Sequence, residues 1–260
     1  IETKNLGENL DKIISSEQIK KYIDSIDNLI LTDYSRFILI RNGQKVIDFY
    51  LFTLMDLENS NFNIPDEKIE LFKQLIDEFF YFKLPTIKDA EELARELAKK
   101  AKLLKDRVKI QLKEDLSKNT DENALLSPIY DFYLGIKSLI IDINIEDAAD
   151  AYAQTVTYGL FLARKNPLNK EIDRISAYAF IPENIGIIKR MFTNMSTSEF
   201  PSNISWIIDD IVKILNVTDM NEVFSAINKR GLIDKDPIIF LYEDFLNFYE
   251  PDKKKKLGVY

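Results

Sequence analysis

The residue pair with the clearest chemical potential is Glu2 and Lys4, in the N-terminal segment Ile1-Glu2-Thr3-Lys4. We predict a short β-strand here, and residues two apart on a strand point to the same face, so the carboxylate and the ammonium group would share one site. A carboxylate can bind Mg²⁺, and a lysine beside it can position water. Exposed strands often alternate charged residues in the same way, so the pattern alone does not separate a metal site from a solvated edge.

The absence of both His and Cys limits the chemistry that this chain can perform. It excludes Ser-His-Asp and Cys-His hydrolases, disulfides, and metal sites that use imidazole or thiolate ligands. Carboxylates, Lys, Tyr and hydroxyl groups remain, and a carboxylate-bound Mg²⁺ site is compatible with them. The lack of Cys also agrees with a reducing compartment.

A second set of candidate residues is a row of basic side chains on a predicted helix over residues 90–116. At about 1.5 Å per residue this helix would be roughly 40 Å long, with an apolar stripe on one side. The basic residues recur at three- and four-residue steps on another side, and they are Arg95, Lys99, Lys102, Lys105, Lys109 and Lys113. Such a row could contact DNA phosphates, which position a protein without reading the base sequence, although a Lys-rich solvated face gives the same pattern.

A helix predicted over residues 145–167 is the central element of the chain. Asn144 is its expected N-cap, and Arg164 and Lys165 near its end suit the negative end of the helix dipole. Most side chains between these ends are apolar, which predicts a helix packed on more than one side. Gln154 and Thr155 interrupt the apolar pattern, and because buried amides usually find hydrogen-bond partners, we favour a structural role for them over a catalytic one.

The first 56 residues follow a different pattern from the rest. They contain a strand near residue 2, a helix capped by Ser16, a strand over residues 29–32, and two strands around Asn42-Gly43, the strongest short hairpin signal available. Beyond Pro65 the apolar spacing is helical almost throughout. The predicted fold class is therefore mainly α, with a small N-terminal α/β part made of strand, helix, strand and β-hairpin.

Composition places the chain among globular proteins, since 46% of its residues are hydrophobic and 30% are charged. No apolar run approaches the roughly 18 residues that a bilayer crossing needs, and no secretion signal is visible, so we expect a cytoplasmic protein with no membrane partner. The net charge of −8 argues against nucleic-acid binding over the whole surface but leaves room for local basic stripes. A strand-like start without Met and the unstructured ending predict a fragment of a longer protein.

Three segments carry a family resemblance. They are Asp27-Asn28-Leu29-Ile30-Leu31-Thr32-Asp33-Tyr34 with Phe37; Ala151-Tyr152-Ala153-Gln154-Thr155 with Tyr158-Gly159-Leu160-Phe161-Leu162-Ala163-Arg164; and Asp236-Pro237-Ile238-Ile239 with Tyr242-Glu243-Asp244-Phe245-Leu246, Tyr249, Pro251 and Gly258-Val259-Tyr260. They resemble large bacterial restriction-modification enzymes that carry an adenine amino-methyltransferase. The first segment resembles the end of the nuclease-like region of this family, the second its Tyr-Ala-Gln-Thr…Tyr-Gly-Leu-Phe-x-Ala-Arg element, and the third the segment leading into its methyltransferase domain. The resemblance runs nearly end to end.

The resemblance implies three regions: the remnant of a PD-(D/E)XK-like nuclease domain over residues 1–56, a helical coupling domain over 57–250, and the start of a connection into a methyltransferase over 251–260. Glu2 and Lys4 match the Glu-x-Lys half of the nuclease motif, with Glu2 as a metal ligand. The acidic residue that the family carries on a preceding strand has no counterpart here. Asn-Pro-Pro-Tyr and a Gly-rich cofactor loop are also missing, so we expect no cofactor in this chain, although the parent protein would use S-adenosylmethionine and Mg²⁺.

The function that follows from this resemblance is structural coupling within a site-specific adenine DNA methyltransferase and nuclease. The chain would position catalytic domains on double-stranded DNA while being inactive alone. Two alternatives stay open: a Mg²⁺-dependent DNA endonuclease that uses Glu2 and Lys4, and a helical protein-interaction module with no role on DNA.

Overall fold

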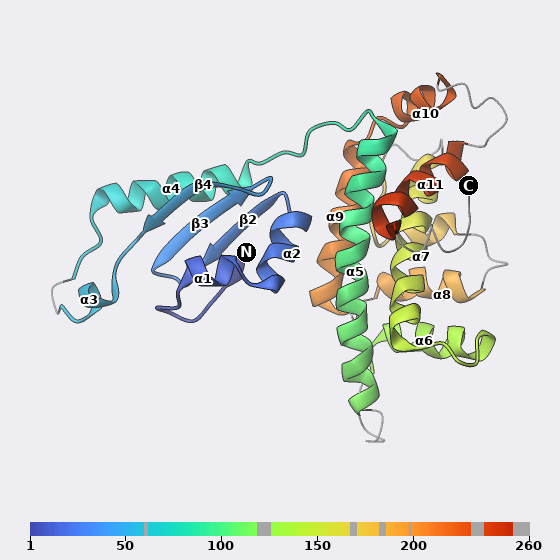
Figure 1. Ribbon diagram of the computed structural model, residues 1–260, viewed down its shortest axis with the longest axis horizontal. Coiled ribbons are helices and arrows are strands. Elements are labelled where there is room, and N and C mark those ends of the chain that lie inside the picture. The colour runs from blue at the N-terminus through green and yellow to red at the C-terminus, as the bar shows by residue number, and fades with distance from the viewer. Residues whose placement is uncertain are drawn as a thin grey trace. The chain divides into compact units, whose positions relative to one another are not determined.

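The chain forms two compact units, Ile1–Leu84 (unit 1) and Pro85–Tyr260 (unit 2), in a computed structural model (Figure 1). The structure describes residues 1–59, 62–118, 126–166, 171–181, 186–197, 199–229 and 237–251. The predicted fold class is confirmed, because unit 2 is helical and unit 1 contains the only sheet found in these ranges. Residues 252–260, most of the predicted connection to a methyltransferase, lie outside the described ranges.

Unit 1 is built on a four-stranded sheet in the order β1-β2-β3-β4. Its strands are β1 (Glu2–Thr3), β2 (Asn28–Thr32), β3 (Arg36–Arg41) and β4 (Gln44–Tyr50). β1 runs parallel to β2, whereas β2–β3 and β3–β4 are antiparallel. The predicted hairpin is confirmed: Asn42 and Gly43 have φ angles of 48° and 78°, as a two-residue type I′ turn requires.

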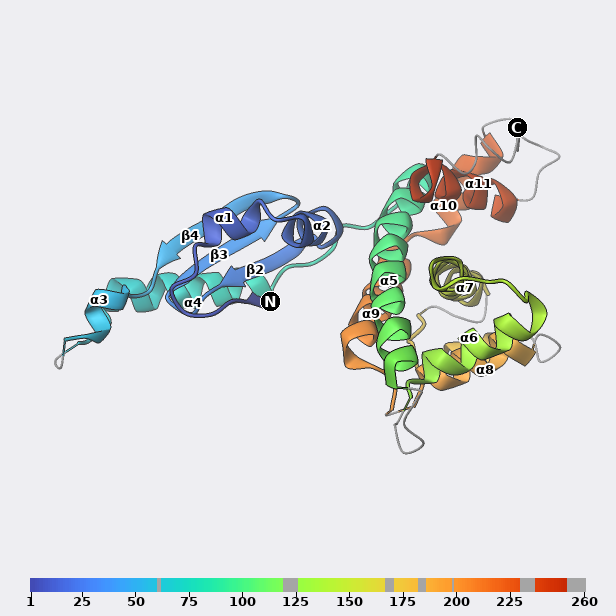
Figure 2. The same ribbon diagram turned by 60° about the horizontal axis from the view of Figure 1, so that its bottom comes forward.

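Helices cover both faces of this sheet. α1 (Leu10–Ile14) and α2 (Glu17–Ser25) lie on one face and α4 (Asp66–Phe80) lies on the other, with the short α3 (Leu54–Leu57) preceding it (Figure 2). The fully buried Leu75 of α4 packs with Ile30, Leu39 and Phe49 of the strands. The boundary between units therefore falls at Leu84/Pro85 rather than after residue 56, because α4 buries its apolar face against the sheet.

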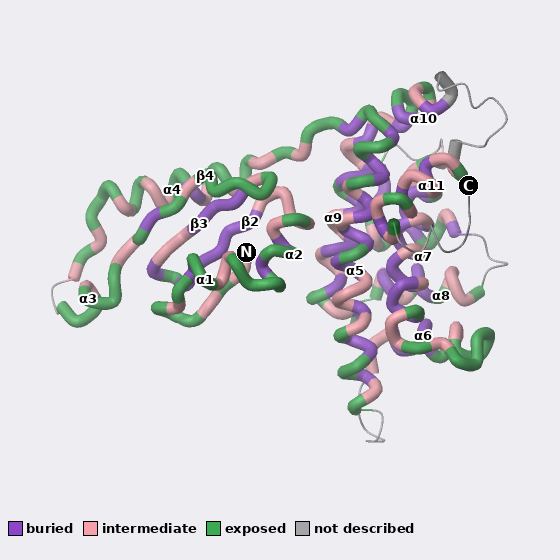
Figure 3. The backbone as a smooth tube through the Cα atoms, in the orientation of Figure 1, coloured by how far each residue is buried: buried purple, intermediate pink, exposed green. Residues whose placement is uncertain are grey.

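Unit 2 is organised around one long helix, α5. Its elements are α5 (Ala90–Lys118), α6 (Pro128–Leu139), α7 (Ile145–Lys165), the 3₁₀ turn η1 (Ala177–Phe180), α8 (Gly186–Met195), α9 (Ser202–Val217), α10 (Met220–Lys229) and α11 (Pro237–Tyr249). α5 packs against α7, α9 and α11, and α6 packs against α8. Buried residues recur along α5 with helical spacing (Figure 3). Among the described residues, no helix has both the length and the apolarity needed to cross a bilayer.

The predicted central helix is α7, and it is buried on several sides. Asn144 caps it as expected, since the Asn144 side chain accepts a 2.8 Å hydrogen bond from the Asp147 backbone N–H. Tyr152, Val156 and Leu160 are almost completely inaccessible to solvent. The helix therefore belongs to the core of unit 2.

Candidate functional site

Glu2 and Lys4 lie together at the edge of the unit 1 sheet. The Lys4 ammonium group contacts Glu2 Oε1 at 2.8 Å, and the side chains of Lys4 and Glu2 are 21% and 23% exposed. The Lys4 backbone N–H donates to the Thr32 carbonyl at 2.8 Å, which continues the parallel pairing of β1 with β2. The structure thus brings the two residues onto one face, as their spacing predicted.

This pair does not by itself fit a magnesium site. Mg²⁺ requires about six oxygen ligands, of which proteins usually supply one or two carboxylates with the rest from water or substrate. No group of three or more acidic side chains in the described residues is arranged so that it could hold a metal ion, and the carboxylate of Glu2 already pairs with Lys4. A working nuclease centre would need a further acidic residue.

Asp33 is the acidic side chain that follows β2, and it is fully engaged in a turn. Its carboxylate accepts hydrogen bonds from the backbone N–H groups of Gly7, Ser35 and Arg36 and from the Ser35 hydroxyl. Burial alone would raise the pKa of Asp33, but these hydrogen bonds outweigh it and lower the pKa. Asp33 therefore holds the turn in which Tyr34 adopts a φ of 70°.

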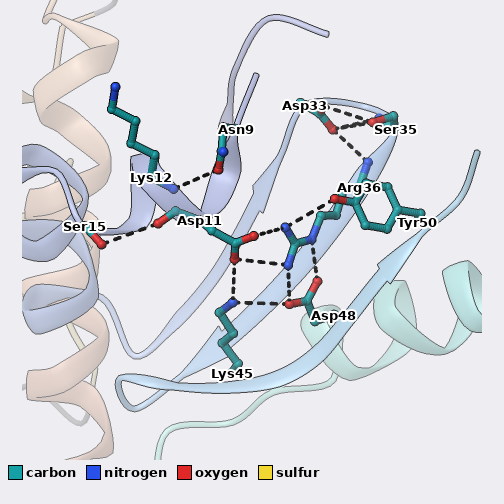
Figure 4. A network of polar contacts seen from close by, with 10 residues as sticks. All are labelled: Asn9, Asp11, Lys12, Ser15, Asp33, Ser35, Arg36, Lys45, Asp48 and Tyr50. Carbon is teal, nitrogen blue, oxygen red and sulfur yellow. Dashed lines mark hydrogen bonds and ion pairs between the residues drawn. The ribbon is translucent and has the colours of Figure 1, made fainter. Parts of the chain in front are cut away.

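A network of four charged side chains joins α1 to the β3–β4 hairpin (Figure 4). The Arg36 guanidinium contacts both oxygens of Asp48, each at 2.8 Å, and both oxygens of Asp11, at 2.6 and 3.2 Å. The Lys45 ammonium group lies 3.2 Å from Asp11 and 3.3 Å from Asp48. The guanidinium also lies over the ring of Tyr50, 5.1 Å from its centroid. Two carboxylates and two cations thus balance one another.

The charge state of this network suits a structural contact between α1 and the β3–β4 hairpin rather than a catalytic acid or base. Hydrogen bonds from Arg36 lower the pKa of Asp48 and of Asp11, and those two carboxylates raise the pKa of Arg36. A general acid or base needs a pKa near the working pH, whereas these groups stay charged at neutral pH. The network was not predicted from the sequence, and the hairpin signal around Asn42-Gly43 was the only local pointer to it.

The basic row of α5 is divided between internal ion pairs and solvent. Lys109 pairs with Glu146 of α7, and Lys105 lies 3.2–3.4 Å from the carboxylates of Glu146, Asp150 and Glu250. Burial would lower the pKa of Lys105, but these three carboxylates outweigh it and raise the pKa. Arg95 and Lys99 pair with acids of α5 itself, Glu91 and Glu96. Lys102 and Lys113 are exposed and make no ion pair among the described residues.

Gln154, in the polar interruption of α7, is hydrogen-bonded within the protein. Gln154 Nε2 donates to Asp150 Oδ2 at 3.2 Å, and Gln154 Oε1 accepts a 3.3 Å hydrogen bond from the Tyr242 hydroxyl of α11. Two further hydroxyl groups join the same helices: Tyr249 of α11 donates to Asp150 Oδ1 at 2.7 Å, and Tyr158 of α7 donates to the Ile238 carbonyl at 2.8 Å. Three hydrogen bonds therefore fix α11 to α7, in addition to ring contacts between Tyr158, Tyr242 and Phe245.

Comparison with known proteins yields weak structural similarity. The sequence matches no protein-family model and no curated protein. The cryo-EM structure of a DrdV–DNA complex contains a chain with 17% sequence identity and a TM-score of 0.32. The match covers 99% of the present chain, which spans 22% of that chain.

Proposed function

We propose that this chain is the structural coupling region of a DNA restriction-modification protein with adenine methyltransferase and nuclease domains. The observation that carries the proposal is the contact between two segments that resemble the family. The Tyr-Ala-Gln-Thr element lies in α7, where Tyr152 and Ala153 are buried. The described part of the segment that resembles the approach to the methyltransferase contains α11. Three hydrogen bonds join them across 80 to 99 residues of sequence.

Such contacts suit a positioning role. A side chain that performs chemistry must reach substrate, whereas Gln154 and Tyr249 are occupied by partners inside unit 2. Hydrogen bonds hold α11 to α7 near both of its ends. A helix held in this way has a restricted orientation, and a domain that follows it inherits that orientation. α7 and α11 would in this way set the orientation of a following methyltransferase domain relative to the helical unit.

The proposal requires that the gene encode more than this chain, so sequencing outward from it is the first test. We expect a strand with an acidic residue upstream and an Asn-Pro-Pro-Tyr motif downstream. The isolated chain, incubated with plasmid, Mg²⁺ and labelled S-adenosylmethionine, should give neither cleavage nor labelled DNA.

The coupling itself is testable in the longer protein with Tyr249→Phe, which removes one hydrogen bond to Asp150. We expect the distance between the recognition site and the cut to become heterogeneous, because the orientation of α11 is less fixed. Tyr178→Phe is the matched control, since Tyr178 is 41% exposed and lies in a different part of unit 2. Uniform cut positions in the Tyr249→Phe protein would argue against the coupling role.

Binding of double-stranded DNA is proposed for the outward-facing part of the basic row, namely Arg95, Lys99, Lys102 and Lys113. Lys109 is better explained by its ion pair with Glu146 of α7, and Lys105 by its ion pairs with α7 and with Glu250, which directly follows α11. Removing one cation that binds a phosphate should reduce the slope of log K against log salt by about one unit. Changing Lys99, Lys102 and Lys113 to Gln should therefore weaken binding to cognate and random duplexes alike, and an unchanged salt slope would make this face a solvated surface.

The alternative of a Mg²⁺-dependent endonuclease rests on the pairing of Glu2 with Lys4 at the end of a parallel strand. Cleavage by the isolated chain that disappears with Glu2→Ala would favour this alternative over the coupling role. A helical protein-interaction module is favoured instead if the longer protein does not bind DNA.

A further inference from the structure

A cleft of about 700 Å³ opens in unit 2 where the end of α7 meets the loop between α9 and α10. Volumes of a few hundred to about 1,000 Å³ are typical of small-molecule sites. Backbone pairing fixes one lining residue, because the Asp219 N–H donates to the Ile87 carbonyl at 2.9 Å. The cleft is therefore framed by regular structure and belongs to unit 2 alone.

The charged residues lining the cleft are Arg164, Lys165 and Asp219, so its lining is net positive in a chain of net charge −8. Cations in the last turn of a helix also suit the helix dipole. Lys165 is exposed, however, and makes no ion pair among the described residues. The Asp219 carboxylate is used locally, since its Oδ1 accepts a 3.0 Å hydrogen bond from the Glu222 N–H at the start of α10.

An aromatic ring lies beside these cations. Phe224 lines the same cleft and is only half-buried. The Lys165 ammonium nitrogen lies over its ring, 5.4 Å from the centroid, and the tilted ring of the buried Phe161 lies 6.1 Å away, centroid to centroid. The exposed amide of Asn221 and the hydroxyl of Thr86 add neutral polar groups to the walls.

We propose that this cleft binds a nucleotide: the exposed Lys165 side chain moves off the ring of Phe224 to bind the phosphate, and the base stacks on the ring face that it leaves. A cation next to an aromatic ring matches the two parts of a nucleotide, since phosphate oxygens accept hydrogen bonds from Lys and Arg and every base offers a π-face for stacking. Inorganic phosphate alone would leave the ring unused. A free nucleotide and a nucleotide within a DNA strand share this chemistry, and the two sources are distinguished by experiment.

The test measures binding to the whole chain of the four nucleoside 5′-monophosphates, of adenosine, of inorganic phosphate and of a fluorescent single-stranded oligodeoxynucleotide. Lys165→Gln should weaken nucleotide binding about 10- to 100-fold, the range for removing a hydrogen bond between charged groups. Phe224→Leu should weaken it at least about fivefold, because the base can no longer stack on a ring. Lys213→Gln is the matched control, because it removes one positive charge from an exposed side chain on α9 that already pairs with Asp210.

The outcomes separate clearly. Binding of monophosphates that Lys165→Gln and Phe224→Leu weaken, and Lys213→Gln does not, supports a site for a free nucleotide. The same pattern with the oligodeoxynucleotide alone supports a site for a strand. The proposal is overturned if inorganic phosphate binds as tightly as the monophosphates, or if Lys165→Gln weakens adenosine binding as much as nucleotide binding. It is also overturned if neither the monophosphates nor the oligodeoxynucleotide bind. Fluorescence of Trp206, the single Trp of the chain, verifies that each variant is folded.

Discussion

Gly159, in the middle of α7, is the position where a single methyl group should have the clearest effect. A Cβ atom built there would lie 2.4 Å from Cζ and 2.8 Å from Cε2 of Phe192 on α8. Phe192 is completely buried, so its ring has no open space into which it can turn. Gly159→Ala therefore forces α7 and α8 apart or pushes the Phe192 side chain out of its rotamer.

Two opposing effects decide whether Gly159→Ala raises or lowers the free energy of unfolding. Ala is favoured over Gly inside a helix by about 1 kcal/mol, whereas overpacking a well-filled core costs about 1–3 kcal/mol. Because two ring atoms would be closer than 3.0 Å, we expect the upper half of that cost and a net loss of about 1–2 kcal/mol. For a unit of this size the melting temperature should fall by roughly 2–8 °C.

Urea unfolding followed by Trp206 fluorescence measures this loss in unit 2 alone, since Trp206 is the only Trp and lies on α9. Gly135→Ala is the matched control on α6. Its Cβ would meet only the terminal methyl of Ile187, at 2.9 Å, and the neighbouring Cγ1. The half-buried Ile187 can rotate away, so stability should stay constant or rise by up to about 1 kcal/mol.

A double-mutant cycle with Phe192→Leu tests whether the ring is the cause. Phe192→Leu alone should destabilise unit 2, and its cost should be smaller by about 1 kcal/mol or more when Gly159→Ala is present, because residues in contact are energetically coupled. If Gly159→Ala instead stabilised the protein by the full helix-propensity gain, Phe192 would be able to move and the packing argument would fail.

Three further predictions concern the charged clusters and the division into units. Lys105→Met should destabilise unit 2 by about 3 kcal/mol, because the carboxylates of Glu146, Asp150 and Glu250 lose the cation that they share. Lys102→Met, at an exposed site, should change stability by less than about 0.5 kcal/mol. Equal effects of the two changes in urea unfolding would contradict this prediction. The pKa of Asp48 is lowered in the folded protein, so the Asp48 carboxylate stabilises unit 1 at pH values above its unfolded pKa of about 3.9. This contribution disappears as the pH falls through the folded pKa. The protection of β3–β4 amides against hydrogen exchange should therefore decrease more between pH 5 and pH 2 in the wild type than in Asp48→Asn. Leu75→Ala should cost unit 1 about 2–5 kcal/mol without shifting the Trp206 transition, and a shifted transition would mean that α4 does not belong to unit 1 alone.

Local sequence determined most of the elements of this protein. Asn42-Gly43 specified its hairpin because a type I′ turn needs two residues that tolerate positive φ, and Asn144 specified the start of α7 because its side chain satisfies an N–H group that the helix leaves unpaired. Apolar spacing was sufficient to identify the long helices and the buried character of α7. The pairing of Glu2 with Lys4 also followed from spacing alone.

Tertiary packing decided what each polar residue does. A two-residue turn pairs Arg41 with Gln44, and continuing that register would place Asp48 on the face opposite to Arg36. A bulge at Val46 shifts the register so that Asp48 lies opposite Ile38, on the same face as Arg36. One extra residue in a strand reverses the face of every side chain beyond it, and no local signal in the sequence announces it. The charged network that joins α1 to the hairpin therefore depends on the bulge.

The same distinction holds for the basic row of α5 and for the boundary between the units. Helical periodicity places Lys105 and Lys109 beside Lys102. Only the packing of α7, and of Glu250 directly after α11, supplies the carboxylates that pair with the first two and leaves the third in solvent. The amphipathic pattern of α4 predicts a buried face without naming its partner, and the apolar surface of the sheet, assembled from β2, β3 and β4, is what draws this helix into unit 1. Periodicity is a property of one segment, whereas the identity of the surface that a segment meets depends on the whole chain.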